Sequence, residues 1–119
     1  MRTDHRRTCG LRGEGLAYGF LTARGLTVRA RNWRTARGEL DLVCLAGDTL
    51  VFVEVKTRRT LACGTAAEAV DRRKRHRLAQ LAEAYMARHP HAGPCRFDVV
   101  SVAWTGGMPL IEHLVGVDP

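Results

Sequence analysis

Apolar residues recur along this chain with two periods, one typical of helices and the other of strands. Helical spacing predicts a first helix over residues 13–24 and an amphipathic second helix that Asp71 caps and Pro90 ends. Strand-like runs cover residues 26–32, 39–45, 50–56, 96–104 and 109–117, of which the first, with its basic face, suits an outer strand. The order helix, three strands, helix, two strands predicts an α/β domain with a mixed sheet.

The strands over residues 39–45 and 50–56 are joined by a segment with hairpin-turn chemistry, residues 46–49. Side chains alternate along a strand, so Glu54 and Lys56 project from one face, about 7 Å apart. An antiparallel pairing then brings Asp41 beside Glu54. Charged residues within so apolar a run are costly unless something binds them.

Two carboxylates and an ammonium group at one place suit a hard divalent cation such as Mg²⁺. Beside such an ion, Lys56 could orient a water molecule or neutralise charge on a phosphate, as phosphodiester hydrolysis requires. Lysine is rare here: 17 of the 19 basic residues are arginine, and only Lys56 and Lys74 are lysine. The alternative is a structural ion-pair cluster of Asp41, Glu54 and Lys56 without a metal.

These motifs resemble the PD-(D/E)xK nuclease superfamily and, more closely, the YraN family of small bacterial proteins, which are similar in turn to archaeal Holliday-junction resolvases. The resemblance runs from about residue 13 to residue 102. It includes Glu14 with Ala17, Asn32, the segment Arg37-Gly38-Glu39-Leu40-Asp41-Leu42-Val43, residues 50–58, Lys74, and Arg96-Phe97-Asp98-Val99-Val100.

The resemblance implies a restriction-endonuclease-like fold, a mixed central sheet flanked by helices. It implies that Asp41, Glu54 and Lys56 are catalytic, and that Asp41 and Glu54 hold Mg²⁺ or Mn²⁺ with help from Glu14 and the carbonyl of Val55. The implied activity is metal-dependent cleavage of branched DNA by a homodimer. Because members of the superfamily can lose catalysis, a nucleic-acid-binding adaptor that does not cut DNA or RNA is the alternative, and a purely structural or protein-interaction role is a third.

Two acids have further interpretations. Glu14 lies near the start of the expected first helix, where a carboxylate could simply compensate the helix dipole. Glu39 shares a face with Asp41 and could be a ligand, a group that supports the ligands, or a salt-bridge partner of Arg37. Asp98 is expected to be structural, paired with an arginine of the second helix.

A net charge of +7 and a pI near 10.1 favour a polyanionic partner, and nucleic acid is the obvious one. Lys74 could in addition reach the scissile phosphate, and Trp33 could stack on a base, although covering the sheet edge is the better interpretation. For the second helix, a merely solvated basic face is the alternative. The expected phosphate-binding residues are Arg37, Arg58 and Arg59 in loops, and Arg72, Arg73, Lys74, Arg75 and Arg77 on the second helix.

The length of 119 residues suits one domain, expected over residues 11–119 after a mobile basic tail of residues 1–10. The four cysteines have neither zinc nor disulfide spacing, and Cys44 reads as a small buried hydrophobe in a reducing compartment. No apolar run is long enough for a membrane, so we expect a soluble, cytoplasmic protein.

Overall fold

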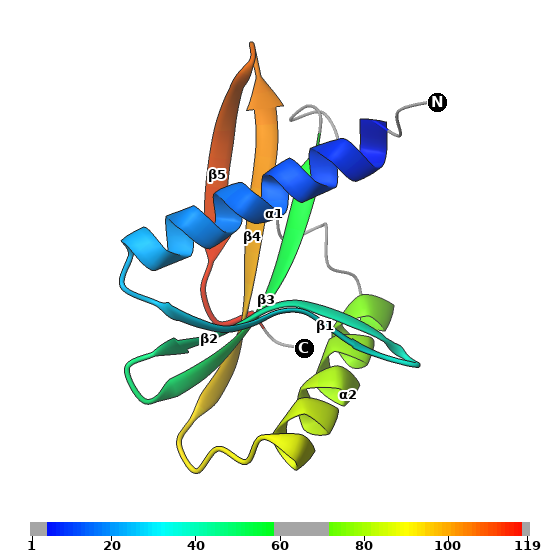
Figure 1. Cartoon of the computed structure of the whole chain (residues 1–119), viewed down its shortest axis with the longest axis vertical. Coiled ribbons are helices and arrows are strands. Elements are labelled where there is room, and N and C mark those ends of the chain that lie inside the picture. The colour runs from blue at the N-terminus through cyan, green and yellow to red at the C-terminus, as the bar shows by residue number, and fades with distance from the viewer. Residues whose placement is uncertain (1–4, 59–71, 118–119) are drawn as a thin grey trace.

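A computed structural model describes residues 5–58 and 72–117 of the chain. Helices and strands follow one another in the order α-β-β-β-α-β-β, as the sequence predicts (Figure 1). The elements are α1 (His5–Ala23), β1 (Thr27–Thr35), β2 (Gly38–Ala46), β3 (Thr49–Arg58), α2 (Arg72–Arg88), β4 (Cys95–Thr105) and β5 (Met108–Leu114).

The five strands form one mixed sheet in the order β1-β2-β3-β4-β5. Strands β3 and β4 are parallel, and every other neighbouring pair is antiparallel. The parallel pair needs a crossover, which α2 supplies. Strand β1 lies at one edge, so the prediction of an outer strand there is confirmed.

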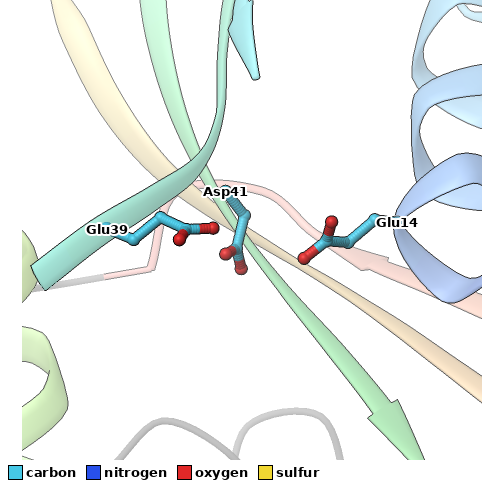
Figure 2. Close-up of side chains that lie close together, drawn as sticks. All are labelled: Glu14, Glu39 and Asp41. Carbon is cyan, nitrogen blue, oxygen red and sulfur yellow. The ribbon is translucent and has the colours of Figure 1, made fainter. Parts of the chain in front are cut away.

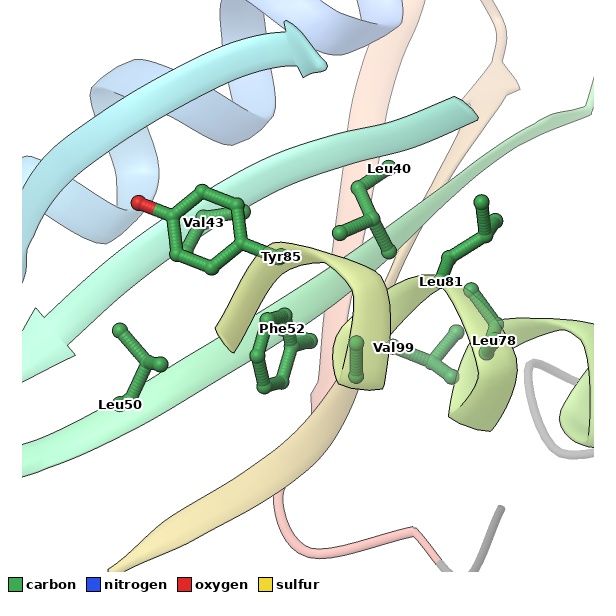
Figure 3. Packing of buried hydrophobic residues seen from close by; sticks show 9 residues of the cluster. Leu40, Val43, Leu50, Phe52, Leu78, Leu81, Tyr85 and Val99 are labelled. Carbon is green, nitrogen blue, oxygen red and sulfur yellow. The ribbon is translucent and has the colours of Figure 1, made fainter. Parts of the chain in front are cut away.

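Each helix covers its own face of the sheet, because β3 sends alternate apolar residues to opposite sides. Val51 and Val53 pack in the cluster that contains α1, around the fully buried Leu21. Phe52 packs in the other cluster against α2, where the ring of Tyr85 meets it edge-on at 5.9 Å between centroids (Figure 3). The two clusters fix both helices against β3, the strand predicted to carry Glu54.

The hairpin of β2 and β3 is closed at its turn and open at its far end. The two strands pair from Ala46 and Thr49 up to Leu42 and Val53. Beyond that point the first residues of β2 pair with β1, whereas β3 continues along β4 as far as Arg58. The strands therefore separate at Asp41 and Glu54, the two acids singled out in the sequence.

Helix α1 approaches β3 closely through a glycine. Gly13 is buried, and a Cβ atom at this position would overlap the hydroxyl group of Thr57 on β3. The absence of a side chain thus permits the contact. It places the next residue, Glu14, beside the open end of the hairpin.

Two boundaries differ from the predictions. The tail expected up to residue 10 is too long, because α1 begins at His5; residues 5–10 lack apolar periodicity but contain no proline to prevent helix propagation. Strand β1 continues beyond residue 32, where the predicted strand ended, to Thr35, so only Ala36 and Arg37 separate it from β2. The predicted cap, Asp71, lies outside the described residues, and α2 ends before Pro90 as expected.

Candidate metal centre

Three carboxylates converge at the open end of the hairpin. Glu14 comes from α1, and Glu39 and Asp41 come from β2 (Figure 2). One oxygen atom of each lies within 4.8 Å of the others, and all three residues are partly buried. Oxygen ligands at this separation from two different elements are the donor set that Mg²⁺, Mn²⁺ or Ca²⁺ prefers.

Where β2 and β3 separate, the side chain of Asp41 replaces a backbone carbonyl as a hydrogen-bond acceptor. Its Oδ2 atom accepts a hydrogen bond of 2.8 Å from the backbone N–H of Val55. Burial, and then the nearby charge of Glu54, raise the pKa of Asp41 to about 8, although the Val55 bond acts in the opposite direction. At neutral pH the protein without a bound cation therefore favours a proton on Asp41.

Glu14 is the tenth residue of α1 and does not lie at its beginning, because the helix starts at His5. Helix-dipole compensation, which acts only within the first turn, therefore does not explain this acid. Burial, followed by the charge of Glu39, raises the pKa of Glu14. The presence of a carboxylate at this position, among other acids, therefore needs an explanation other than the helix dipole.

Asn32 connects two of the three carboxylates. With its amide nitrogen turned toward them, it donates to Glu39 Oε1 at 2.6 Å and to Glu14 Oε2 at 3.3 Å. Asn32 has a φ angle of 52°, in the left-handed region. Asn32 belongs to the segment that resembles the family, but the sequence alone assigned it no role.

Glu39 forms a salt bridge, one of its predicted roles, but with a different partner. Its Oε2 atom accepts a 2.8 Å hydrogen bond from Nε of Arg34, whose side chain is 77% exposed, and the expected partner was Arg37. Arg37 lies in the β1–β2 turn, whereas Arg34 directly faces Glu39 across the β1–β2 register. So exposed an ion pair holds Glu39 weakly.

Glu54 reaches the same site from β3. A cavity of about 210 Å³ opens there. Within it, Lys74 of α2 lies with its Nζ atom 3.2 Å from Glu54 Oε1. The residues lining the cavity are Glu39, Asp41, Glu54, Lys74, Arg77, Leu78 and Leu81.

Asp41 and Glu54 thus share one cavity, whereas Lys56 is not among the described residues that line it. Lys56 is partly buried, and strand alternation puts it on the same face as Glu54. The lysine paired with a carboxylate here is Lys74, whereas the sequence favoured Lys56.

The basic residues expected to bind phosphate fall into different environments. Arg58 is not in an exposed loop: it ends β3, is only 6% exposed, and donates from Nη2 to Ser101 Oγ at 2.8 Å. Arg37 and Arg77 are exposed, and Arg75 is partly buried. Arg59 lies outside the described residues, as do the side chains of Arg72 and Arg73.

Trp33 and Asp98 have structural surroundings. Trp33 is partly buried and meets Tyr85 edge-on at 5.3 Å, which agrees with the interpretation that it covers the sheet edge. Asp98 was expected to pair with an arginine of α2, and this is wrong. It is 1% exposed and accepts bonds from Arg96 on its own strand and from Nε2 of His113 on β5. Asp98 belongs to the face that α1 covers, which an α2 side chain cannot reach.

Two smaller expectations concern Cys44 and the membrane. Cys44 is fully buried, and burial raises the pKa of its thiol to about 11, so the interpretation as a buried hydrophobe is confirmed. Neither helix of the described part of the chain has the length and apolar character that crossing a membrane requires.

A β-hairpin that opens at a carboxylate cluster between two helices defines an α/β protein with a candidate divalent-cation site. The chain belongs to the uncharacterised protein family UPF0102, whose model matches residues 13–102. This is the YraN family, so the resemblance seen in the motifs is confirmed.

Curated relatives that match most of the chain carry the same family name. A UPF0102 protein of Beutenbergia cavernae is 53% identical over 110 residues, covering 91% of this chain and 93% of the relative. One from Arthrobacter sp. (strain FB24) is 50% identical with the same two coverages. One from Pseudomonas aeruginosa is 48% identical over 103 residues, covering 85% of this chain and 82% of the relative. These matches establish the family and leave its chemistry to be argued from the site.

Proposed function

We propose that the protein is a Mg²⁺- or Mn²⁺-dependent endonuclease that hydrolyses phosphodiester bonds in structured or branched DNA. The observation that carries this proposal is the convergence of Glu14, Glu39 and Asp41 where β2 and β3 separate, with a raised pKa at Asp41. Clustered carboxylates with raised pKa values are typical of functional sites. A divalent cation would relieve their mutual repulsion.

The residues fit such an ion because every donor is a hard oxygen atom. Asp41 and Glu14 would hold it, with Glu54 and the carbonyl of Val55 completing the set that the family resemblance implies. When bound, the ion supplies Lewis-acid polarisation of the phosphate and stabilises its developing charge. An ion bound at Glu54 would compete with Lys74 for that carboxylate, whose Oε1 atom lies 3.2 Å from Lys74 Nζ.

The chain's own cations would perform the remaining steps. Lys56, two residues beyond Glu54 on the same strand face, would orient the attacking water. Lys74, already 3.2 Å from Glu54, would then be available to the phosphate. Leu78 and Leu81 form the apolar part of the cavity wall and restrict access of bulk water.

A cleavage assay tests the proposal. Purified protein is incubated with four-way-junction, flap and single-stranded DNA, with Mg²⁺, Mn²⁺ or EDTA. We expect metal-dependent products, which Asp41→Asn and Lys56→Ala should reduce by about a hundredfold or more. Glu83→Gln, which removes an exposed carboxylate from α2, is the matched control and should cleave normally.

The second candidate is a nucleic-acid-binding adaptor without catalysis. It is favoured by one observation, the absence of Lys56 from the described lining of the carboxylate cavity. In the same assay, an adaptor would bind DNA tightly and yield no products with any metal. Products that persist unchanged in Asp41→Asn would contradict the proposed site.

A further inference from the structure

A second cavity lies next to the carboxylate cavity. It has a volume of about 710 Å³ and is lined by Arg37 from the β1–β2 turn and by His76, Arg77 and Gln80 from α2. Arg77 lines both cavities. A ligand that spans the two would therefore pass this arginine.

The two cavities have opposite chemistry. The first contains three carboxylates, whereas the four lining residues of the second include none. Two guanidinium groups and an amide present many hydrogen-bond donors, which suit phosphate oxygens. Among the described residues, the lining has no phenylalanine, tyrosine or tryptophan, the residues on which unpaired bases stack.

Backbone packing holds Arg77 between the cavities. The start of β2 passes beneath its aliphatic stem at Gly38, where a Cβ atom would lie 3.5 Å from Arg77 Cδ. Gly38 has a φ angle of 148°, which disfavours other residues. The aliphatic stem of Arg77 therefore lies close to the backbone three residues before Asp41.

We propose that the second cavity binds the sugar-phosphate backbone of a nucleic-acid strand next to the phosphate that occupies the carboxylate cavity. The identity of that neighbouring phosphate rests on the proposed function. Arg37 and Arg77 each contact a phosphate, and recognition is by charge and not by base sequence.

Binding without metal tests this proposal separately from cleavage. The affinity of labelled single-stranded oligonucleotides of two unrelated sequences is measured by fluorescence anisotropy in EDTA over a series of salt concentrations. Arg37→Gln and Arg77→Gln should each weaken binding about three- to tenfold for both sequences and reduce the salt slope by about 0.7. Arg29→Gln, an exposed arginine of β1, should change affinity less than about twofold.

Three results would overturn the subsite: unchanged affinity in both variants, a wild-type protein that binds no strand, or competition by polyglutamate as strong as that by DNA. Binding that depends on both arginines without any cleavage would support the subsite and contradict the nuclease. Cleavage that is unaffected by both arginine substitutions would support the nuclease and contradict the subsite.

An independent observation concerns Asn32. It is the sole non-glycine residue with a positive φ angle among those described, and its amide bonds Glu14 and Glu39 together. Such backbone strain is costly and clusters at functional sites. Asparagine tolerates it better than most residues, and its amide offers the two N–H donors that two carboxylates can share.

We infer that Asn32 is a positioning residue that holds Glu14 and Glu39 ready for a cation. The inference rests on the proposed metal site. Without this amide, the two carboxylates repel one another across the gap between α1 and β2. The strained residue thus joins three elements, since it lies on β1.

Replacement by glycine removes the amide and keeps the backbone angle, so it isolates the side chain's effect. We expect Asn32→Gly to weaken Mn²⁺ binding about tenfold in calorimetry. The control Asn32→Asp keeps the size of the side chain and tolerates the φ angle but adds a carboxylate. This variant should have a lower thermal stability than the wild type without metal, and Mn²⁺ should restore that stability. Wild-type affinity in Asn32→Gly would overturn the role of Asn32 alone. A wild-type protein that binds no Mn²⁺ would overturn the metal site as well.

Discussion

The closed and open halves of the β2–β3 hairpin differ in what satisfies their backbones. In the closed half, the strands pair with each other and their side chains are apolar and buried, as at Val43 and Phe52. In the open half, a side chain, Asp41, accepts a bond from the backbone of β3, and carboxylates face a cavity. The packing of the apolar half therefore fixes the position along the hairpin at which the two strands separate.

This difference separates stability from chemistry. The closed half contributes to stability through the burial of apolar side chains, so a substitution that removes buried volume there should lower the free energy of unfolding. The open half brings together like charges, which costs stability unless a cation or a proton is present. Four predictions test that contrast.

Phe52→Ala, in the closed half, should lower the free energy of unfolding by about 3–5 kcal/mol, because it leaves a cavity under Tyr85. Urea denaturation followed by circular dichroism measures the change. A loss below about 1 kcal/mol would mean that the closed half does not dominate stability.

Mn²⁺ at a hundredfold excess over its dissociation constant should raise the free energy of unfolding by about 2.7 kcal/mol, because the folded protein alone assembles the carboxylates. Thermal unfolding with and without metal measures this. Asp41→Asn should abolish most of the gain, and Glu83→Gln should retain it. An equal gain in all three proteins would assign the ion to another place.

The metal-free protein should lose stability as the pH rises from about 4 to about 8. Between the ordinary pKa of 3.8 and the folded-state pKa of about 8, Asp41 retains a proton in the folded protein that the unfolded chain has released. The free energy of unfolding therefore decreases with pH, by at most about 1.4 kcal/mol per pH unit. Urea titrations at several pH values in EDTA measure the slope, and Asp41→Asn should flatten it. A slope of the opposite sign would contradict the folded-state pKa.

Arg58→Met should change stability by only about 0–1 kcal/mol, in the stabilising direction, and leave DNA affinity unchanged. The guanidinium is buried, and its Nε and Nη1 atoms have no hydrogen-bond partner among the described residues, so an apolar side chain of similar length removes unsatisfied donors. Chemical denaturation and anisotropy measure the two quantities. A marked loss of DNA binding would restore the original expectation for Arg58.

Local periodicity was sufficient to predict the helices, the strands and the hairpin with its turn. The proximity of Asp41 and Glu54, which line one cavity, was predictable from the register of the hairpin, because one register fixes every side chain along a strand. The sequence also ranked Lys56 above Lys74, since both are rare lysines but only Lys56 shares a strand with Glu54.

Contacts that depend on how the helices sit on the sheet were not predictable in this way. The proximity of Lys74 to Glu54 requires the position of α2, and the burial of Arg58 depends on packing beyond the strand itself. The role of Asn32 had one available signal: asparagine is the residue other than glycine that most readily adopts a positive φ angle within a strand. Its two partners lie 7 and 18 residues away, beyond the range of local patterns.

The contact between Gly13 and Thr57 has a consequence for how the spacing of the three carboxylates can change. Because nothing but a hydrogen atom fits between helix and strand, a single added methyl group would push the helix outward and carry Glu14 away from its two companions. The distance between the acids is thus set by Gly13, a neighbouring residue without a reactive group. Even a methyl group at this position would change the geometry of the whole carboxylate cluster.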